Sequence, residues 1–243
     1  MSGMVGIIFK DGIQMYTDGT TYDEDGVCRL FNQKTDIMLP QETIMASRGS
    51  GRTGLILRMM MTVRTDFDDI SDHLKEDLEN AIYEGWRAGD ACNLAVLIGG
   101  WSEREKKFRM GNMYAQGEDP WNSVPGSYEM NWNNHYYAAP WPDHAELQAA
   151  GIIDEGQTET TINLGDDAQV VLLMEAMRRT RYQLGPETKG TGCLIGGFIQ
   201  RTTLQRGSAC TFIIHRWPDK IGEHIGVGVV DYRAEDSHEA APA

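Results

Sequence analysis

The sequence has no apolar run that approaches the roughly 18 residues a helix needs to cross a bilayer. Its first residues, Met-Ser-Gly-Met-Val-Gly, also lack the charged start and apolar core of a secretory signal peptide. Both absences argue against a membrane protein and against an exported one. We therefore expect no membrane partner and a cytoplasmic location.

Basic residues are scarce relative to acidic ones. The chain carries 22 Lys and Arg against 36 Asp and Glu, which gives a formal net charge of −14 at pH 7. A surface with this balance repels the phosphate backbone of nucleic acids and the headgroups of anionic lipids. We therefore expect no nucleic-acid partner, and we interpret the negative charge as a source of solubility.

Paired metal-ligand motifs are also missing. The four cysteines are scattered without a Cys-x-x-Cys pair, and the six histidines show no His-Glu-x-x-His. Small and apolar neighbours surround most of the cysteines, which favours buried free thiols. Gly49-Ser50-Gly51 and Gly196-Gly197 lack the Lys-Ser/Thr ending of a phosphate-binding loop. The sequence predicts neither a metal site nor a bound cofactor.

What the chain does contain begins with a β-hairpin. Residues 4–9 are apolar and rich in β-formers, Lys10-Asp11-Gly12 is typical of a tight turn, and 13–17 continue as a second strand. Further strands are predicted at 93–101, 107–115, 193–204 and 209–217, and helices at 53–63, 71–88 and 166–182. The elements come in groups, which favours packed sheets covered by helices over alternating βαβ units.

Length and composition suit a single domain, which we expect over residues 1–233. A stretch at about 116–160 is rich in Asn, Gly, Pro and aromatic residues and is expected to be an irregular insertion. Its aromatics predict either a small apolar cluster that pins the insertion or a recognition surface. The short polar segment 234–243 is expected to be a flexible tail.

The start of the chain carries a recognisable pattern. It consists of Ser2-Gly3-Met4-Val5-Gly6, the turn Lys10-Asp11-Gly12, Asp18 and Lys34. This pattern resembles the proteasome β-subunits and their bacterial ring-protease relatives, and the intervals from Ser2 to Asp18 and from Asp18 to Lys34 match the spacing in that family. The resemblance implies an α+β fold of N-terminal-nucleophile (Ntn) hydrolase type, a four-layer αββα sandwich of two antiparallel sheets flanked by helices.

The resemblance also implies a role for each matched residue. Ser2 would be the nucleophile after removal of Met1, with its own α-amino group as the base. The Lys34 ammonium would lower the pKa of that amine and of the hydroxyl, and Asp18 would hold and orient Lys34. The backbone N–H groups of Arg48 and Gly49 would form the oxyanion hole.

The chain departs from the family pattern in several places. The nucleophile would be serine in place of threonine. The family has an acid followed by a Ser-Gly loop near the late strand pair, where this sequence offers Gln205-Arg206-Gly207-Ser208. Its Gly-Ser-Gly loop is missing, and Tyr136-Tyr137-Ala138-Ala139-Pro140 stands near that place.

Two functions therefore stay open. One is a hydrolase that cleaves peptide (amide) bonds with Ser2, acting on a peptide or protein substrate inside an oligomeric chamber. The other is a non-catalytic structural or assembly subunit with the same fold. In that case Ser2 is an ordinary residue after the initiator, Asp18 a turn residue and Lys34 a surface charge. The resemblance and the helix at 53–63, apolar around most of its circumference, together suggest homo-oligomers.

Overall fold

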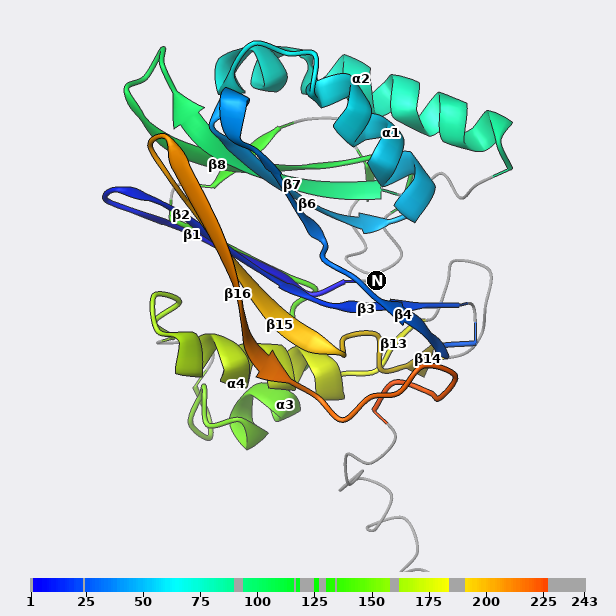
Figure 1. Cartoon of the computed structure of the whole chain (residues 1–243). Helices are drawn as coiled ribbons and strands as arrows, with labels where there is room; N and C mark the ends of the chain where they lie inside the picture. The colour runs from blue at the N-terminus through cyan, green and yellow to red at the C-terminus, as the bar shows by residue number, and fades with distance from the viewer. Residues whose placement is uncertain are drawn as a thin grey trace, which may run out of the picture.

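The computed structural model describes residues 2–23, 25–89, 94–115, 117–118, 125–126, 130–133, 135–157, 162–183 and 191–226. Two five-stranded antiparallel sheets face each other, and a pair of helices covers the outer side of each sheet (Figure 1). The predicted flexible tail at 234–243 lies outside the described residues, and so does Cys92.

The first sheet has the strand order β12-β1-β2-β15-β16. Its strands are β1 (Met4–Phe9), β2 (Gly12–Asp18), β12 (Tyr136–Ala139), β15 (Phe198–Gln205) and β16 (Ser208–Arg216). The predicted N-terminal hairpin is confirmed, because Ile8 pairs with Ile13 and Phe9 with Gly12 across the turn. The second strand of this hairpin ends at Asp18, which pairs with Ile199 near the start of β15.

The second sheet has the order β11-β8-β7-β6-β5. Its strands are β5 (Thr35–Met38), β6 (Thr43–Gly49), β7 (Leu94–Ser102), β8 (Lys107–Tyr114) and β11 (Asn131–Asn133). The predicted hairpin of 93–101 and 107–115 corresponds to β7 and β8. The segment 116–160, expected to be irregular, contributes β11 to one sheet and β12 to the other, so it forms part of both.

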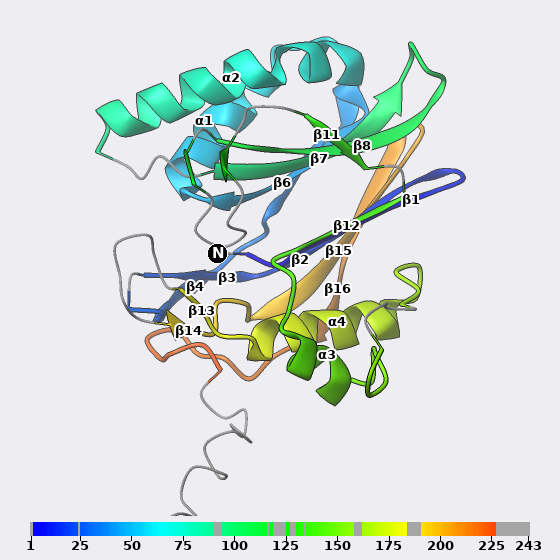
Figure 2. The same cartoon turned by 180° about the vertical axis from the view of Figure 1, so that it is seen from behind.

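Two helices lie outside each sheet, as both views of the molecule show (Figures 1 and 2). Helices α1 (Gly51–Met61) and α2 (Phe67–Arg87) cover the second sheet, and α3 (His144–Ala149) and α4 (Asp167–Arg179) cover the first. Helix α2 begins before the predicted residue 71, because the Asp66 side chain caps it by accepting the Asp69 N–H.

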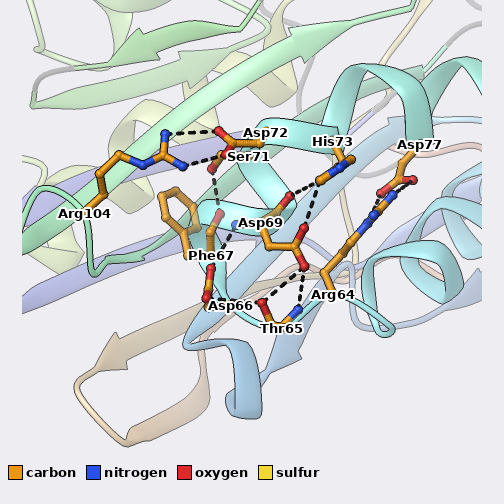
Figure 3. Close-up of polar contacts among 10 residues, drawn as sticks. All are labelled: Arg64, Thr65, Asp66, Phe67, Asp69, Ser71, Asp72, His73, Asp77 and Arg104. Carbon is orange, nitrogen blue, oxygen red and sulfur yellow. Dashed lines mark hydrogen bonds and ion pairs between the residues drawn. The ribbon is translucent and has the colours of Figure 1, made fainter.

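The start of α2 is tied down by further polar contacts (Figure 3). Arg64 donates to both carboxylate oxygens of Asp77, from Nε at 3.0 Å and from Nη2 at 2.6 Å. Arg104, from the turn between β7 and β8, donates to Asp72. Forked Arg–carboxylate pairs fix geometry as well as charge, so α2 is held to the preceding loop and to the β7–β8 turn of the second sheet.

Three apolar layers separate the four layers of backbone. Between the sheets lie residues including Met4, Ile13, Met15, Ile44, Ala46, Leu97 and Met110. Between the first sheet and α3/α4 lie Val5, Tyr16, Ile199, Val170, Leu173, Met174 and Met177. Between the second sheet and α1/α2 lie Met45, Val96, Ile98, Leu57, Met61, Ile70 and Leu74. The protein is therefore an α+β, four-layer αββα sandwich, as the sequence predicts.

Small elements complete the described chain. They are the 3-10 turn Leu39–Gln41 and the pairs β3 (Thr20–Tyr22) with β4 (Cys28–Phe31), β9 (Gly117–Glu118) with β10 (Pro125–Gly126), and β13 (Tyr182–Gln183) with β14 (Thr191–Gly192). Cys28 is buried, whereas Cys210 is exposed in contrast to the expectation of buried thiols. Among the helices of the described segments, none combines the length and apolar character of a membrane span.

Gly100 on β7 sits where the second sheet meets α2, and a side chain there has no room. A Cβ at this position would lie 2.3 Å from Phe67 Cδ2 and 2.7 Å from the Glu42 carbonyl oxygen. We expect Gly100→Ala to lower the free energy of unfolding by about 1–3 kcal/mol through overpacking. Chemical denaturation measures the change. Gly51→Ala is the control, since a Cβ there meets nothing within 4 Å; equal losses in both variants would contradict the tight packing.

Candidate active site

Ser2 lies two residues before the start of β1 and is only 7% exposed. The neighbouring Gly3 is held by both of its backbone groups. Its N–H donates to Asp18 Oδ1 at 3.0 Å, and its carbonyl accepts the Asp18 N–H at 3.3 Å. The start of β1 is therefore fixed beside the end of β2.

The Asp18 carboxylate is fully buried and accepts hydrogen bonds from four residues far apart in the sequence. One is the Gly3 N–H. The N–H groups of Thr20 and Gly196 donate to Oδ2, each at 3.2 Å. Lys34 Nζ donates to both oxygens, at 2.9 and 3.0 Å. Burying a carboxylate is tolerable only when its lone pairs are satisfied in this way.

Lys34 lies directly before β5, and 8% of its side chain is exposed. Burial lowers the pKa of the Lys34 ammonium below its ordinary value. The Asp18 carboxylate opposes that shift because it stabilises the charged form, and the Cys28 thiol acts in the same direction as Asp18. Asp18 and Lys34 thus form one buried ion pair that is hydrogen-bonded to the residue after Ser2.

Arg48 and Gly49 end β6, immediately before the Ser50 cap of α1. The Arg48 side chain is 1% exposed and lies on the same face of β6 as Ile44 and Ala46, which belong to the layer between the sheets. Its guanidinium carbon is 5.8 Å from the centre of the Tyr114 ring. A buried cation therefore enters the space between the sheets, a position that the sequence pattern did not indicate.

The structure brings three of the five predicted site residues together. Asp18 and Lys34 are hydrogen-bonded to each other, and Ser2 is linked to them through the N–H of its neighbour Gly3. Within the described ranges, no hydrogen bond or ion pair joins Arg48 or Gly49 to these three. Gly49 adopts a φ of 111°, which favours glycine and turns the chain out of β6 into α1.

The expectation that residues 205–208 occupy the place of the supporting acid and Ser-Gly loop is wrong. Asp18 pairs with Ile199, whereas Ile13, at the other end of β2, pairs with Leu204. The turn at 205–208 is therefore roughly 20 Å from Asp18, at about 3.3 Å per residue along β15. It lies beside the turn between β1 and β2.

The segment that does lie beside Asp18 is the loop 194–197, which sequence reasoning missed. Its Gly196 N–H donates to Asp18, and a Cβ on Gly3 would lie 3.2 Å from Ile195 Cδ1. The pairing of Asp18 with Ile199 places this loop beside Asp18, because counting back along β15 from Ile199 leads to Gly197 and Gly196. The segment 136–140, which stands near the place of the missing Gly-Ser-Gly loop in the sequence, lies beside the start of β1, since Ala139 pairs with Met4.

Metal-ligand groups do not gather in the part of the chain that the structure describes: no cluster of three or more His, Cys, Asp or Glu side chains could hold an ion there. The chemistry available at this end of the sandwich is that of a hydroxyl, a buried ammonium and a carboxylate, with the backbone N–H groups around them.

Comparison with known proteins gives a result only at the level of structure. No family model and no curated protein matches the chain. Anbu (ancestral beta-subunit) from Yersinia bercovieri superposes with a TM-score of 0.57 and 11% identity over 99% of this chain and 98% of its own. Two structures of Anbu from Hyphomicrobium sp. strain MC1 have TM-scores of 0.57 and 0.52, identities of 11% and 12%, and coverage of at least 99% of both chains.

These matches correct the family assignment drawn from the sequence. The similar structures are Anbu proteins, a family distinct from the proteasome β-subunits to which the N-terminal pattern was assigned. At 11–12% identity the likeness establishes the fold alone. The chain thus has a proteasome-like Ntn-hydrolase fold.

Because both members of the Asp18–Lys34 pair are buried, Lys34→Met is expected to lower the free energy of unfolding by about 3–5 kcal/mol, as it leaves a buried carboxylate unpaired. The double variant with Asp18→Asn should lose less than the sum of the two single variants by about 0.5–3 kcal/mol. Denaturant titrations of the four proteins measure this cycle, with the exposed Lys75→Met as control. Strictly additive losses would contradict the pairing.

Proposed function

We propose that the protein is an N-terminal-nucleophile hydrolase that cleaves peptide (amide) bonds, with Ser2 as nucleophile once Met1 has been removed. One observation carries the proposal: the fully buried Asp18 carboxylate, paired with the largely buried Lys34 ammonium, accepts a hydrogen bond from Gly3, the residue next to Ser2. Met1 itself lies outside the described residues.

The chemistry follows from the groups gathered at this end of the sheet. A free α-amino group has an ordinary pKa of about 7.7–8.0, so an appreciable fraction is neutral near pH 7–8 and able to accept a proton. The Ser2 hydroxyl proton passes to the amine as the oxygen attacks the amide carbonyl. The Lys34 ammonium lowers the pKa of the amine, which keeps a larger fraction of it neutral and able to accept a proton. It also lowers the pKa of the hydroxyl that gives the proton up.

The remaining steps balance without a cofactor. Collapse of the tetrahedral intermediate breaks the C–N bond, the leaving amine takes the proton, and an ester joins the substrate acyl group to Ser2. Water then hydrolyses this ester by the same proton transfers in reverse. In the proposal, the backbone N–H groups of Arg48 and Gly49 stabilise the negative oxygen of each intermediate.

A second candidate function is that of a non-catalytic structural subunit, and one observation favours it. The loop beside Gly3 places the apolar side chain of Ile195 against the start of β1. The family pattern used to assign the site has an acid and a serine in its supporting loop, and Leu194 to Gly197 provide neither. In that function the Asp18–Lys34 pair serves to hold the end of the sandwich together.

Ser2→Ala separates the two functions, because alanine removes the hydroxyl and leaves the buried ion pair intact. We expect hydrolysis of fluorogenic peptides to fall by on the order of 10⁴-fold or more, with stability changed by about 1 kcal/mol or less. Ser208→Ala, in an exposed position at the far end of the first sheet, is the control and should keep full activity.

The assay requires chains that begin at Ser2, and the intact mass of the protein measures whether Met1 has been removed. Retention of Met1 in the native assembly would remove the amine base and refute the hydrolase. Wild-type chains that begin at Ser2 but turn over no member of broad peptide libraries would establish the structural subunit instead.

The proposal includes a second copy of the chain as partner and a single domain over residues 1–233, with the segment 116–160 as its insertion. Leu55, Met59 and Val63 follow one another at intervals of four residues and are 54%, 64% and 79% exposed. Leu55 and Met59 on α1, with Val63 just beyond its end, form an exposed apolar surface that a second copy could cover.

We expect Met59→Glu to reduce the native mass, because it places a charge in this apolar surface. Asn80→Glu adds the same charge at an exposed position of α2 and should leave the mass unchanged. Light scattering over a range of concentrations measures both variants. A wild-type protein that is monomeric at every concentration would rule out assembly through α1.

A further inference from the structure

A second buried ion pair lies behind the loop 194–197. Arg178 on α4 and Asp219 each have side chains that are 1% exposed. The guanidinium donates to both carboxylate oxygens, at 2.8 and 2.5 Å, and its Nη1 also donates to the Ile195 carbonyl at 2.6 Å. Arg178 therefore fixes both the carboxylate and the backbone of the loop.

Two consecutive backbone amides connect this pair to the candidate active site. The Gly197 N–H donates to Asp219 Oδ2 at 2.7 Å, and the Gly196 N–H donates to Asp18 Oδ2 at 3.2 Å. Neighbouring N–H groups of one dipeptide thus bind two different buried carboxylates. The two amides lie in adjacent peptide planes that meet at the Gly196 Cα, so any contact that restricts Gly196 links the position of Asp219 to that of Asp18.

Close packing leaves this dipeptide little freedom. A Cβ on Gly196 would lie 2.5 Å from Asp219 Oδ2 and 2.7 Å from Arg178 Nη1. Gly197 has a φ of +76°, and a Cβ there would lie 2.7 Å from a Phe31 ring carbon. The glycines are required both for the backbone conformation and for the approach of the ion pair.

We infer that Arg178 and Asp219 are positioning residues that hold Asp18, and through it Lys34, in place by way of Gly196 and Gly197. The inference rests on the proposed function, since it gives these two residues a role at the Ser2 site. Both residues act through the loop 194–197. They lie far along the chain from the N-terminal pattern of Ser2, Asp18 and Lys34 that indicated the site.

The electrostatics agree with a rigid network. Burial by itself would raise the pKa of Asp219, but the charge of Arg178 and the hydrogen bonds from Arg178, Gly197 and Gly226 together outweigh burial, and the pKa lies below its ordinary value. Four titratable groups besides Arg178 interact here: Asp18, Cys28, Lys34 and Asp219. Asp18 and Cys28 face Lys34, and Cys28 also faces Asp219. A displacement of the Asp18 carboxylate would therefore change the pKa of Lys34 before that of the other groups.

The charge-conserving variant Arg178→Lys is the sharpest test, made on the full-length native assembly. Lysine keeps the positive charge but cannot reproduce the forked contact. We expect the pKa of Lys34 to fall by about one unit, because burial acts on the ammonium with less opposition from a displaced Asp18. NMR titration of lysines carrying ¹³C at Cε measures that pKa, and Lys34→Arg assigns the signal.

Activity provides the second readout. If the loop relaxes, kcat for peptide hydrolysis should fall by on the order of 10²-fold with KM unchanged, as misplacement of a catalytic group costs rate more than binding. The matched control is Arg64→Lys in the forked Arg64–Asp77 pair under α2 (Figure 3). It should change neither kcat nor the pKa of Lys34.

Each outcome decides between positioning and plain structural support. A folded Arg178→Lys protein with wild-type Lys34 titration and kcat would overturn the inference. If that variant does not fold, the Lys34 titration and kcat are measured on Asp219→Asn instead. Failure of both variants to fold would overturn the inference and assign the pair to folding alone. A wild type without turnover refutes the proposed function, whereas a shifted Lys34 titration would still support the positioning.

Discussion

The end of the sandwich at which Ser2 lies is organised around one buried carboxylate, that of Asp18. An unpaired charge in such a place would cost several kcal/mol, so the fold must supply donors from whatever segments reach it. It does so from Gly3 just before β1, from Thr20 at the start of β3, from the loop before β5 and from the loop before β15. Those four segments are fixed relative to one another because each donates to the same two oxygens.

This arrangement gives stability and chemistry a common origin. The ion pair that satisfies Asp18 in the interior also opposes the lowering of the Lys34 pKa by burial. Replacing either residue therefore alters the fold and the candidate site together, and neither change alone separates a catalyst from a structural subunit. Ser2 differs, because its hydroxyl is not one of the donors to Asp18, and its removal leaves the network complete.

The fold persists at 11–12% identity to Anbu because its requirements are general. Both sheets need apolar residues on both faces, and many combinations of Met, Ile, Leu and Val meet that need. A catalytic site has narrower requirements. The loop beside Gly3 carries Ile195 where the family pattern has polar support, and a buried Arg48 enters the space between the sheets. Similarity of fold therefore does not by itself transfer an activity to this chain.

The sequence by itself determined the local elements. Periodicity and turn chemistry predicted the hairpin at Lys10-Asp11-Gly12, the main helices and the grouping that leads to two covered sheets, and the matched spacing singled out Asp18 and Lys34. Only the tertiary structure decided that the loop 194–197 completes the Asp18 network, that Arg178 and Asp219 stand behind it, and that the turn at 205–208 lies far away. The reason is physical. Turns and helices are specified by neighbours in the chain, whereas a buried charge is satisfied by donors that sheet register brings together from distant segments.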